Sequence, residues 1–579
     1  MTDERARACR RIGEETRMNS YENDEPHSGG TTVEATGAAH GGAGGTKPWD
    51  WLMIPPAHLR PFADAWRGLT IADLAERRVA EDPEFVAMID DKRALTRREW
   101  LADAHALASA MRARGLQAGD VVAFQVPNWH EAAVLNLACA IAGFIVNPIV
   151  PIYRDAEVRQ MLRDCGARAF FTCTEFRRFD FSQMAQRLRN ELADLAFTFT
   201  IRGSGPDNFA ALVDEGRGMP QQRAAIDPNG VKMVLYTSGT TGLPKGVLHS
   251  HNTIEHILRT SYEHWGVAAG DAIIMPSPVT HISGYANGLE SPLVSGTSVI
   301  LMEAWNADEA IRLIEKHGVT GTVAATPFLV ELADAARDAG TRLPTMRWFA
   351  CGGAAVPPDL IPCAHEAFDN LNAFRVFGAS EVPLVTYGWP QDETLAATTD
   401  GQVVTYDVRV VDEAGRDVPA GTEGEILARG ASMMLGYADA DQTAAAITRD
   451  GYFQTGDLGN IEANGAITIT GRKKDLIIRG GENISAVEIE DVLRTHPQVR
   501  DASVVAMPHE RLGEGVCAYI ISAGPPASVE ALCRHVQDSG LAKQKTPERF
   551  EFVDDYPRTA SGKIRKDMLR ADVREKLEG

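Results

Sequence analysis

The sequence predicts an α/β protein with a large amino-terminal body, a small antiparallel β subdomain and a compact α+β unit at the carboxyl end. Three features of the chain carry this prediction. Strand-like apolar runs alternate with helical patterns from about residue 49 to residue 380, the order that gives a mostly parallel sheet covered by helices. Short alternating strands follow at about 385–470. A last unit begins near residue 474 and contains two helical patterns.

Composition bounds the class of protein. At about 150 residues per domain, 579 residues make three or four structural units. Hydrophobic residues are 44% of the chain, enough for a sizeable core. A net charge of −21 argues against a nucleic-acid partner. The eight cysteines form no CxxC pair. The charged amino terminus lacks the apolar stretch of a signal peptide. No apolar run reaches the roughly 18 residues of a membrane span. A cytoplasmic protein without a membrane span is therefore expected.

Residues 1–48 are predicted to form a disordered tail. The stretch 28–46 is rich in Gly, Ala and Thr and has almost no large apolar side chain. It cannot bury enough surface to offset the entropy lost on ordering the chain. Order is expected to begin near Trp49, and Met18 remains open as an alternative start.

The strands and helices of the body follow from the apolar runs. The strand at 121–126 is followed by a helical pattern over 130–142, and the strand at 144–150 is followed by a helix from Asp155. Further strands are predicted at 167–172, 231–237, 272–277, 298–302 and 321–327.

Capping and turn residues place the ends of several elements. Asp308 is the predicted N-cap of a helix that Gly318 ends. The pair at 464–465, Asn-Gly, indicates a hairpin in the β subdomain. Ser485 and Glu488 have the spacing of a capping box. A further helix is expected over 529–538.

The segment 236–247, YTSGTTGLPKGV, is the most informative part of the chain. It follows a strand and precedes a helix that Asn252 and Glu255 can cap. Its glycines allow backbone N–H groups to face an anion, and its hydroxyls and lysine add donors and positive charge. A Walker A loop is excluded, because Pro244 and Gly246 flank the lysine. The predicted phosphate-binding residues are Thr237, Ser238, Gly239, Thr240, Thr241, Gly242 and Lys245.

Together with this loop, four further segments resemble motifs of the adenylate-forming superfamily, which includes acyl-CoA synthetases, luciferases and peptide-synthetase adenylation domains. They are FGASE at 377–381, with Ser380 in place of the usual Thr, TGD at 455–457, GRKKD at 471–475 and PRTASGKIR at 557–565. The five motifs stand in the family's order. The resemblance implies an amino-terminal domain at 49–473 and a small mobile carboxyl-terminal domain at 474–579.

The resemblance also implies a role for each motif. Lys563 would bridge the substrate carboxylate and the α-phosphate, and Glu381 would bind Mg²⁺. Phe377 would stack on adenine, and Asp457 would accept hydrogen bonds from the ribose hydroxyls. Arg472 would donate to ribose or phosphate. The nucleotide would also lie against Gly352, Gly353, Ala354, Gly378 and Ser380.

Other residues are assigned by the same resemblance. Lys474 would be the hinge about which the carboxyl-terminal domain rotates. Gly480, Gly481 and Glu482 would lie beside the pantetheine arm of coenzyme A. The acyl pocket would contain His281, Tyr285 and Gly353, with His281 as a catalytic candidate. His249 and His251 are expected to be capping or packing residues.

The implied activity is a carboxylate–CoA ligase that uses ATP and Mg²⁺, takes CoA as co-substrate, and releases AMP and pyrophosphate. The pocket segment PVTHISG lacks the Asp that holds an amino acid's amine in peptide synthetases, so an uncharged organic acid is expected. Three segments, NPIVPIYR at 147–154, CGGAAVPP at 351–358 and GLAKQKTPERFE at 540–551, most resemble cyclohexanecarboxylate-CoA ligases and related medium-chain acyl-CoA synthetases. Two alternatives remain open, namely transfer to a carrier-protein arm and a non-catalytic nucleotide- or acyl-binding protein. A homodimer is also open.

Overall fold

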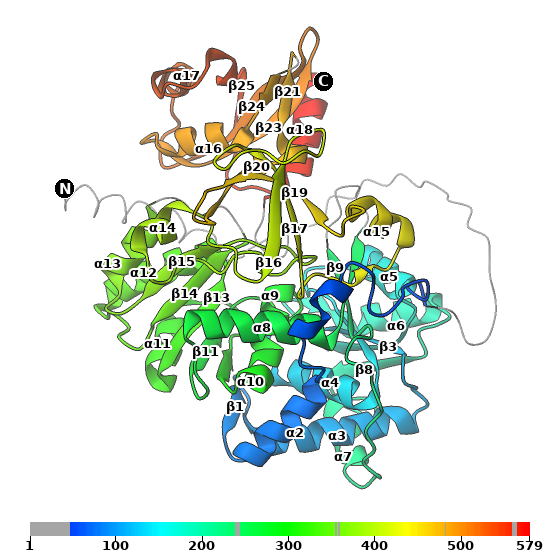
Figure 1. Cartoon of the computed structure of the whole chain (residues 1–579). Coiled ribbons are helices and arrows are strands. Elements are labelled where there is room, and N and C mark those ends of the chain that lie inside the picture. The colour runs from blue at the N-terminus through cyan, green and yellow to red at the C-terminus, as the bar shows by residue number, and fades with distance from the viewer. Residues whose placement is uncertain are drawn as a thin grey trace.

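The computed structural model describes residues 47–237, 244–353, 356, 359–480, 482–558 and 564–578. Within them, two seven-stranded sheets form the body, a four-stranded antiparallel sheet adjoins it, and a five-stranded sheet carries the carboxyl-terminal unit. Figure 1 shows the carboxyl-terminal unit above the body, joined to it through the antiparallel sheet. The predicted α/β class and order of units are confirmed. The predicted tail at 1–48 falls outside the described residues, apart from its last two positions.

The first body sheet is parallel except at one edge, where β2 runs antiparallel to β1. In spatial order its strands are β15 (Asn372–Val376), β14 (Trp348–Gly352), β13 (Val319–Ala324), β11 (Ala272–Met275), β12 (Ser298–Leu301), β1 (Val86–Ile89) and β2 (Ala94–Thr96). Its connecting helices include α11 (Ala307–His317), α12 (Thr326–Ala339) and α13 (Leu360–Ala367), and α14 (Glu393–Thr398) follows β15.

The second body sheet is parallel from β9 to β8 and antiparallel at β10 and β18. In spatial order its strands are β18 (Gly436–Tyr437), β10 (Lys245–His249), β9 (Met233–Thr237), β4 (Ile145–Pro148), β3 (Val121–Gln125), β5 (Ala167–Cys173) and β8 (Phe197–Ile201). Its helices include α5 (Asp155–Asp164), α6 (Phe181–Glu191) and α7 (Phe209–Gly216).

Apolar helices lie in the interior of the body. Every residue of α4 (His130–Ala142) is buried, as expected for a helix that is apolar on all sides. Most of α8 (His251–Trp265) is buried as well, and Figure 1 shows it crossing the middle of the body. Outer helices include α2 (Ile71–Glu81) and α3 (Arg97–Ala113). No helix among the described residues is long and apolar enough to cross a bilayer.

The loop at 236–247 does not lead directly into a helix, so that part of the prediction is wrong. Its second half enters β10, which pairs antiparallel with β9 and brings Lys245 opposite Thr237. Only then does α8 begin, capped by Ser250 and Thr253 rather than by Asn252 and Glu255. The loop therefore connects two paired strands, and the helix N-terminus lies a full strand away from it.

The antiparallel sheet contains β16 (Tyr406–Val411), β17 (Gly424–Gly430), β19 (Phe453–Ile461) and β20 (Ile467–Arg472). The predicted hairpin joins β19 to β20. Gly465 has φ of 84°, a left-handed conformation that glycine adopts at little cost. The Asn-Gly signal is thus confirmed.

The carboxyl-terminal unit packs three helices on a mixed sheet. Its strands are β21 (Ile477–Arg479), β22 (Glu482–Ile484), β23 (Val499–His509), β24 (Gly513–Ser522) and β25 (Arg549–Phe552). Its helices are α16 (Ala486–Arg494), α17 (Val529–Asp538) and α18 (Lys566–Glu578).

Two capping predictions are wrong in detail although the helices exist. Helix α16 begins after Ser485, but the Ser485 hydroxyl donates to the Thr470 carbonyl (3.2 Å) and makes no cap bond. Glu488 instead pairs with Lys545. Helix α11 is capped by Asn306, two residues before the expected Asp308, and it ends at the left-handed Gly318 as predicted.

Candidate active site

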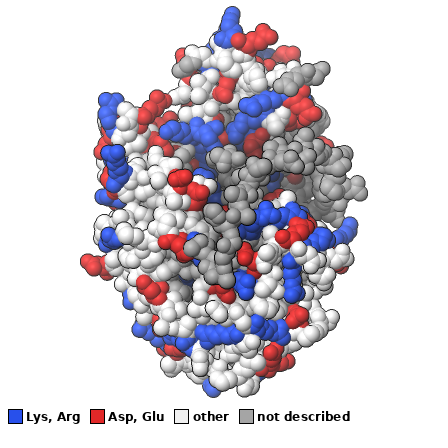
Figure 2. All heavy atoms as spheres, turned by 90° about the vertical axis from the view of Figure 1, so that its right-hand side faces the viewer, with Lys and Arg blue, Asp and Glu red and all other residues white. Residues whose placement is uncertain are grey.

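A cleft of about 4200 Å³ lies between the body and the carboxyl-terminal unit and is lined by residues of both. The strand ends of both body sheets and the antiparallel sheet reach it. Figure 2 shows Lys and Arg side chains next to Asp and Glu side chains over the face on this side of the molecule. Twelve of the predicted site residues line this cleft: Thr237, Lys245, His281, Gly352, Gly353, Phe377, Gly378, Ser380, Glu381, Asp457, Arg472 and Lys474.

Eight predicted residues lie outside the described part of the chain: Ser238, Gly239, Thr240, Thr241, Gly242, Ala354, Gly481 and Lys563. The described residues that flank the Lys563 motif do line the cleft. They are Pro557 and Arg558 on one side and Ile564 and Arg565 on the other.

Glu381 is held by hydrogen bonds at both its side chain and its backbone. The Tyr437 hydroxyl donates to Glu381 Oε1 (2.8 Å). The Met434 N–H donates to the Glu381 carbonyl (2.8 Å). One residue earlier, the Ser380 carbonyl accepts from His249 Nε2 (2.7 Å). The Lys245 ammonium lies 5.0 Å from the centre of the Tyr437 ring.

These contacts fit a magnesium site at Glu381. Oε1 of Glu381 accepts a hydrogen bond from the Tyr437 hydroxyl, whereas Oε2 accepts none from the described residues. Mg²⁺ prefers carboxylate oxygens and binds through one or two of them together with phosphates. Glu381 and Lys245 line the same cleft, so the carboxylate lies in the cavity that also receives the lysine of the predicted phosphate loop.

Asp457 and Arg472 face each other across the β19–β20 pair. Asp457 is 3% exposed, and one of its carboxylate oxygens pairs with Arg472 Nε (2.7 Å). The Thr455 hydroxyl accepts a hydrogen bond from the Asp457 N–H (3.0 Å). The strand pairing therefore fixes the carboxylate, and the guanidinium, which is 43% exposed, extends into the cleft.

Lys474 lies between two residues that are tied to different parts of the molecule. Lys473 pairs with Glu425 of β17 (2.8 Å), and Asp475 pairs with Arg570 of α18 (3.0 Å). All three residues form the short helix η3 (Lys473–Asp475). Burial lowers the pKa of the Lys474 ammonium, and Arg472 adds to this effect.

His281 stands at the start of the segment that lines the inner cleft. It precedes α9 (Ile282–Gly284), and its Nδ1 lies 3.0 Å from the Ser283 hydroxyl. Helix α8 and the neighbouring strand ends complete this side, which we call the apolar wall. It comprises Ile257, Leu258, Ile282, Ala286, Val323 and Val376.

Tyr285 does not line the cleft, which corrects its assignment to the acyl pocket. It begins η2 (Tyr285–Glu290), a π-helical turn. Its ring is fully buried, and its hydroxyl donates to Asn136 of α4 (2.6 Å). The wider turn directs Tyr285 into the body, while Ala286 and Asn287 reach the cleft. A sequence pattern based on 3.6 residues per turn cannot anticipate this shift.

Gly480 and Glu482 lie apart from the cleft lining. Gly480, with φ of 61°, forms the turn between β21 and β22, and its N–H donates to the Leu512 carbonyl (2.8 Å). The Glu482 carboxylate accepts from Gln544 (2.9 Å). In this structure the two residues therefore belong to another face of the carboxyl-terminal unit.

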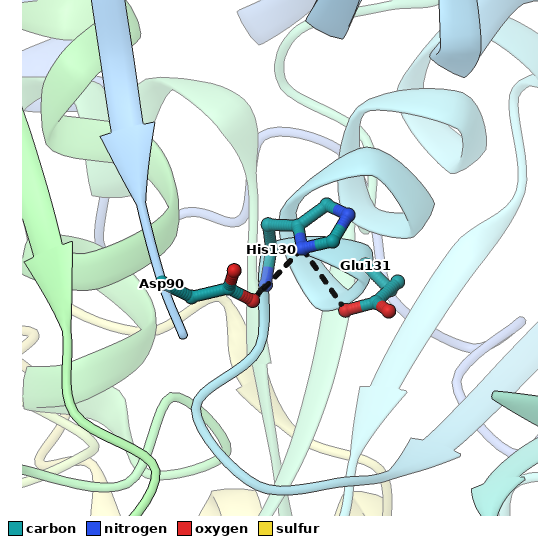
Figure 3. A group of neighbouring side chains, drawn as sticks. All are labelled: Asp90, His130 and Glu131. Atoms are coloured by element: carbon teal, nitrogen blue, oxygen red, sulfur yellow. Dashed lines mark hydrogen bonds and ion pairs between the residues drawn. The ribbon is translucent and has the colours of Figure 1, made fainter. Parts of the chain in front are cut away.

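Asp90, His130 and Glu131 form a cluster with ligand-type side chains outside the cleft (Figure 3). His130 Nδ1 lies 2.8 Å from Asp90 Oδ2 and 3.3 Å from Glu131 Oε2, so this nitrogen carries a proton and cannot be a metal ligand. Arg202 bonds both carboxylates (2.6 and 2.9 Å). Burial acts to raise the pKa of Asp90, but hydrogen bonds from His130 hold it well below its usual range. The cluster is an ion-pair network.

Tyr437 and His249 are the residues of the site that sequence reasoning missed or undervalued. Tyr437 lies 56 positions from Glu381 and His249 lies 131 positions from Ser380. Neither has a local signal, because the contacts depend on the pairing of β10 with β18. The expectation that His249 and His251 are packing residues agrees with their burial, but it did not anticipate the bond to Ser380.

Comparisons with known proteins agree with this geometry. A family model described as AMP-binding enzyme matches residues 75–438, and one described as AMP-binding enzyme C-terminal domain matches residues 488–563. A medium-chain fatty-acid–CoA ligase of Escherichia coli (strain K12) is 33% identical over 88% of this chain and 92% of that protein. A 2,3-dihydroxybenzoate–AMP ligase of Bacillus subtilis (strain 168) is 30% identical over 88% of this chain and 95% of that protein.

Solved structures show the same fold. ATP-bound MatB from Rhodopseudomonas palustris has a TM-score of 0.77 and 27% identity, over 87% of this chain and 99% of that one. Enzymes of this kind use ATP, Mg²⁺ and CoA. The chain therefore belongs to the AMP-binding enzyme family of the adenylate-forming superfamily and is an AMP-forming acid–thiol ligase.

Proposed function

We propose that the protein joins a medium-chain or alicyclic carboxylic acid, whose acyl group carries no charge besides the reacting carboxylate, to CoA. In the first step an oxygen of the acid's carboxylate attacks the α-phosphorus of ATP, and pyrophosphate leaves. In the second step the CoA thiol, after losing its proton, attacks the carbonyl of the acyl-adenylate, and AMP leaves. The observation that carries the proposal is an apolar wall in the same cleft as Glu381, Lys245 and Asp457.

The apolar wall supports an uncharged acyl group. Its members come from α8, the α9–η2 segment and the ends of β13 and β15. Helix α8 contacts η2, α9 contacts β13, and β13 and β15 lie on either side of β14. The guanidinium of Arg375, on the β15 strand that carries Val376, is already paired with Asp400 (2.8 Å). An additional charge on the substrate would lose its hydration here without gaining a partner. The similarity to a medium-chain fatty-acid–CoA ligase agrees with this substrate class.

The opposite side of the cleft suits the nucleotide. In the proposal, the loop 237–245 and Lys245 hold the outer phosphates, while Glu381 Oε2 holds Mg²⁺. Bound there, Mg²⁺ supplies positive charge that neutralises the phosphate oxygens. Phe377 stacks on adenine. Asp457, with one oxygen paired to Arg472, accepts from the ribose hydroxyls.

Two arrangements of the carboxyl-terminal unit are proposed for the two steps. Residues on both sides of Lys563 line the cleft, whereas Gly480 and Glu482 do not. This supports the present arrangement as the one for adenylation, in which Lys563 stabilises the charge that develops on the α-phosphate. Rotation about Lys474 would then exchange the Lys563 loop for the 480–482 face and admit the thiol.

The decisive experiment follows the products from ATP labelled at the α-phosphate. The purified chain is incubated with a panel of carboxylic acids, including hexanoate, octanoate, cyclohexanecarboxylate, benzoate and amino acids. We expect labelled AMP with hexanoate, octanoate or cyclohexanecarboxylate, together with the acyl-CoA thioester when CoA is present. Labelled ADP, or intact ATP with every acid, would exclude the proposed reaction. A thioester that forms only on a phosphopantetheinyl carrier protein would show that the carrier protein, and not CoA, is the acceptor.

A further inference from the structure

We propose that Tyr437 and His249 are positioning residues for Glu381, fixing which of its carboxylate oxygens faces the metal. This proposal rests on the proposed role of Glu381 as the magnesium ligand. Neither side chain would touch the metal. Each would act by holding Glu381 in one orientation, as groups around a ligand commonly do in metal sites.

Tyr437 acts on the carboxylate itself. Its hydroxyl donates to Oε1 (2.8 Å), and the residue is only 3% exposed. A carboxylate oxygen can only accept, so the Tyr437 hydroxyl is the donor in this contact. A carboxylate with one oxygen committed to this donor presents its other oxygen to the cleft.

His249 acts on the peptide that precedes Glu381. A carbonyl oxygen can only accept, so His249 Nε2 must carry the proton in its bond to Ser380 (2.7 Å). The other ring nitrogen, Nδ1, then accepts from the Thr253 hydroxyl (3.1 Å). Burial lowers the pKa of His249 to about 4, which keeps the ring neutral at pH 7, and the contacts with Ser380 and Thr253 select this tautomer.

The two contacts belong to one rigid unit of the second body sheet. Strand β10 runs from Lys245 to His249, and β18 pairs with it so that Val247 lies opposite Tyr437. Lys245 faces the Tyr437 ring at 5.0 Å. Strand β10, which carries Lys245, thus also holds Glu381 in two ways: through its own His249, which bonds Ser380, and through Tyr437 of the paired strand β18. This couples the position of the metal ligand to that of the phosphate site, the kind of preorganisation that electrostatic catalysis requires.

The first test compares Tyr437→Phe with the wild type and with Tyr387→Phe. Tyr387 is an equally buried tyrosine whose hydroxyl bonds Thr260 and Thr405 instead of Glu381. Binding of Mn²⁺ to the ATP-loaded protein is measured by electron paramagnetic resonance, without turnover. We expect Tyr437→Phe to weaken Mn²⁺ binding about tenfold, the lower range for loss of a group that orients a metal ligand. The Tyr387→Phe control should match the wild type.

The second test separates positioning from general damage at His249. His249→Leu removes the donor to Ser380, whereas His249→Gln retains an N–H that can replace it. We expect the leucine variant to lose Mn²⁺ affinity and the glutamine variant to recover most of it. Octanoate binding to the metal-free protein, measured by calorimetry, should stay unchanged in Tyr437→Phe and in both His249 variants.

The outcomes distinguish this proposal from the one on which it rests. If Glu381→Gln leaves Mn²⁺ binding unchanged, Glu381 is not the metal ligand and both proposals fail. If Glu381→Gln weakens it but Tyr437→Phe does not, only the positioning role is excluded. Equal losses of Mn²⁺ and octanoate binding in Tyr437→Phe would also exclude it, because they would indicate a general disturbance of the cleft.

Discussion

At the scale of single residues, Lys563 carries the sharpest prediction of the proposed function. Lys563→Ala should lose about 10²–10³-fold or more in acyl-adenylate formation, the loss typical of removing one preorganised stabilising group. It should still convert supplied acyl-adenylate to thioester, because the lysine would leave the cleft for that step. Rapid-quench assays of the two half-reactions measure both rates. Equal losses in the two would show that Lys563 has no step-specific role.

A second residue-scale prediction concerns the buried ion pair Lys232–Glu290. The two side chains are in contact, 3% and 0% exposed, and Asn136 also donates to Glu290 Oε1 (3.0 Å). Lys232→Met should lower the free energy of unfolding by about 3–5 kcal/mol, because it leaves Glu290 buried without its cation. The double variant Lys232→Met/Glu290→Leu should recover most of this loss. Urea denaturation measures all three proteins, and a single variant as stable as the wild type would contradict the prediction.

At the scale of elements, the hinge gives a prediction of its own. Lys473 is bonded to β17 and Asp475 to α18, so a rotation between the two parts is concentrated at Lys474. Proline fixes φ near −65°. Lys474→Pro should therefore slow thioester formation more than adenylation. Lys474→Ala serves as the comparison, since it removes the same side chain and leaves the backbone free. Normal rates of both steps in Lys474→Pro would place the hinge elsewhere.

The elements also show which features a sequence can predict. Helices α4 and α17 begin and end at the predicted residues. The signals that predict them, an apolar run in α4 and a capping serine before α17, lie in the helix itself or directly beside it. Strand β10 was missed because a five-residue strand next to a helix start has no distinct period. The π-turn that buries Tyr285 was missed because it depends on Asn136 of α4. Motif residues converged on one cleft as expected, whereas Tyr437 and His249 depend on strand pairing.

At the scale of the whole molecule, charges of both signs are mixed. The chain carries a net charge of −21, and Figure 2 shows Lys and Arg side chains interspersed with Asp and Glu side chains over this face. Cleft-lining cations from both parts include Arg178, Lys245, Arg472, Arg500 and Arg565. Positive groups that line a cleft raise the local concentration of anions. Among the described residues, Asp and Glu side chains line the same cleft in greater number, so attraction of ATP and CoA would come from individual Lys and Arg side chains and not from the cleft as a whole.

The stability of the whole molecule should fall in mild acid because of its buried histidines. Burial lowers the pKa of His249 and of His256 to about 4, below the ordinary value of about 6.5. Between these values the unfolded chain binds more protons than the folded one. The contribution of the neutral histidines to the free energy of unfolding is therefore fully present above pH 6.5 and is lost as the pH falls toward 4. Each such histidine contributes up to about 3 kcal/mol to this loss.

His256 allows the effect to be isolated, because it bonds the Ser432 hydroxyl (2.7 Å) and does not line the cleft. His256→Gln cannot take up a proton, so its stability should fall less steeply over this window than that of the wild type. Urea unfolding at several pH values between 4 and 8 measures the two curves. The difference between them should grow with acidity by up to about 3 kcal/mol. Parallel curves would show that His256 is protonated as readily in the folded protein as in the unfolded chain.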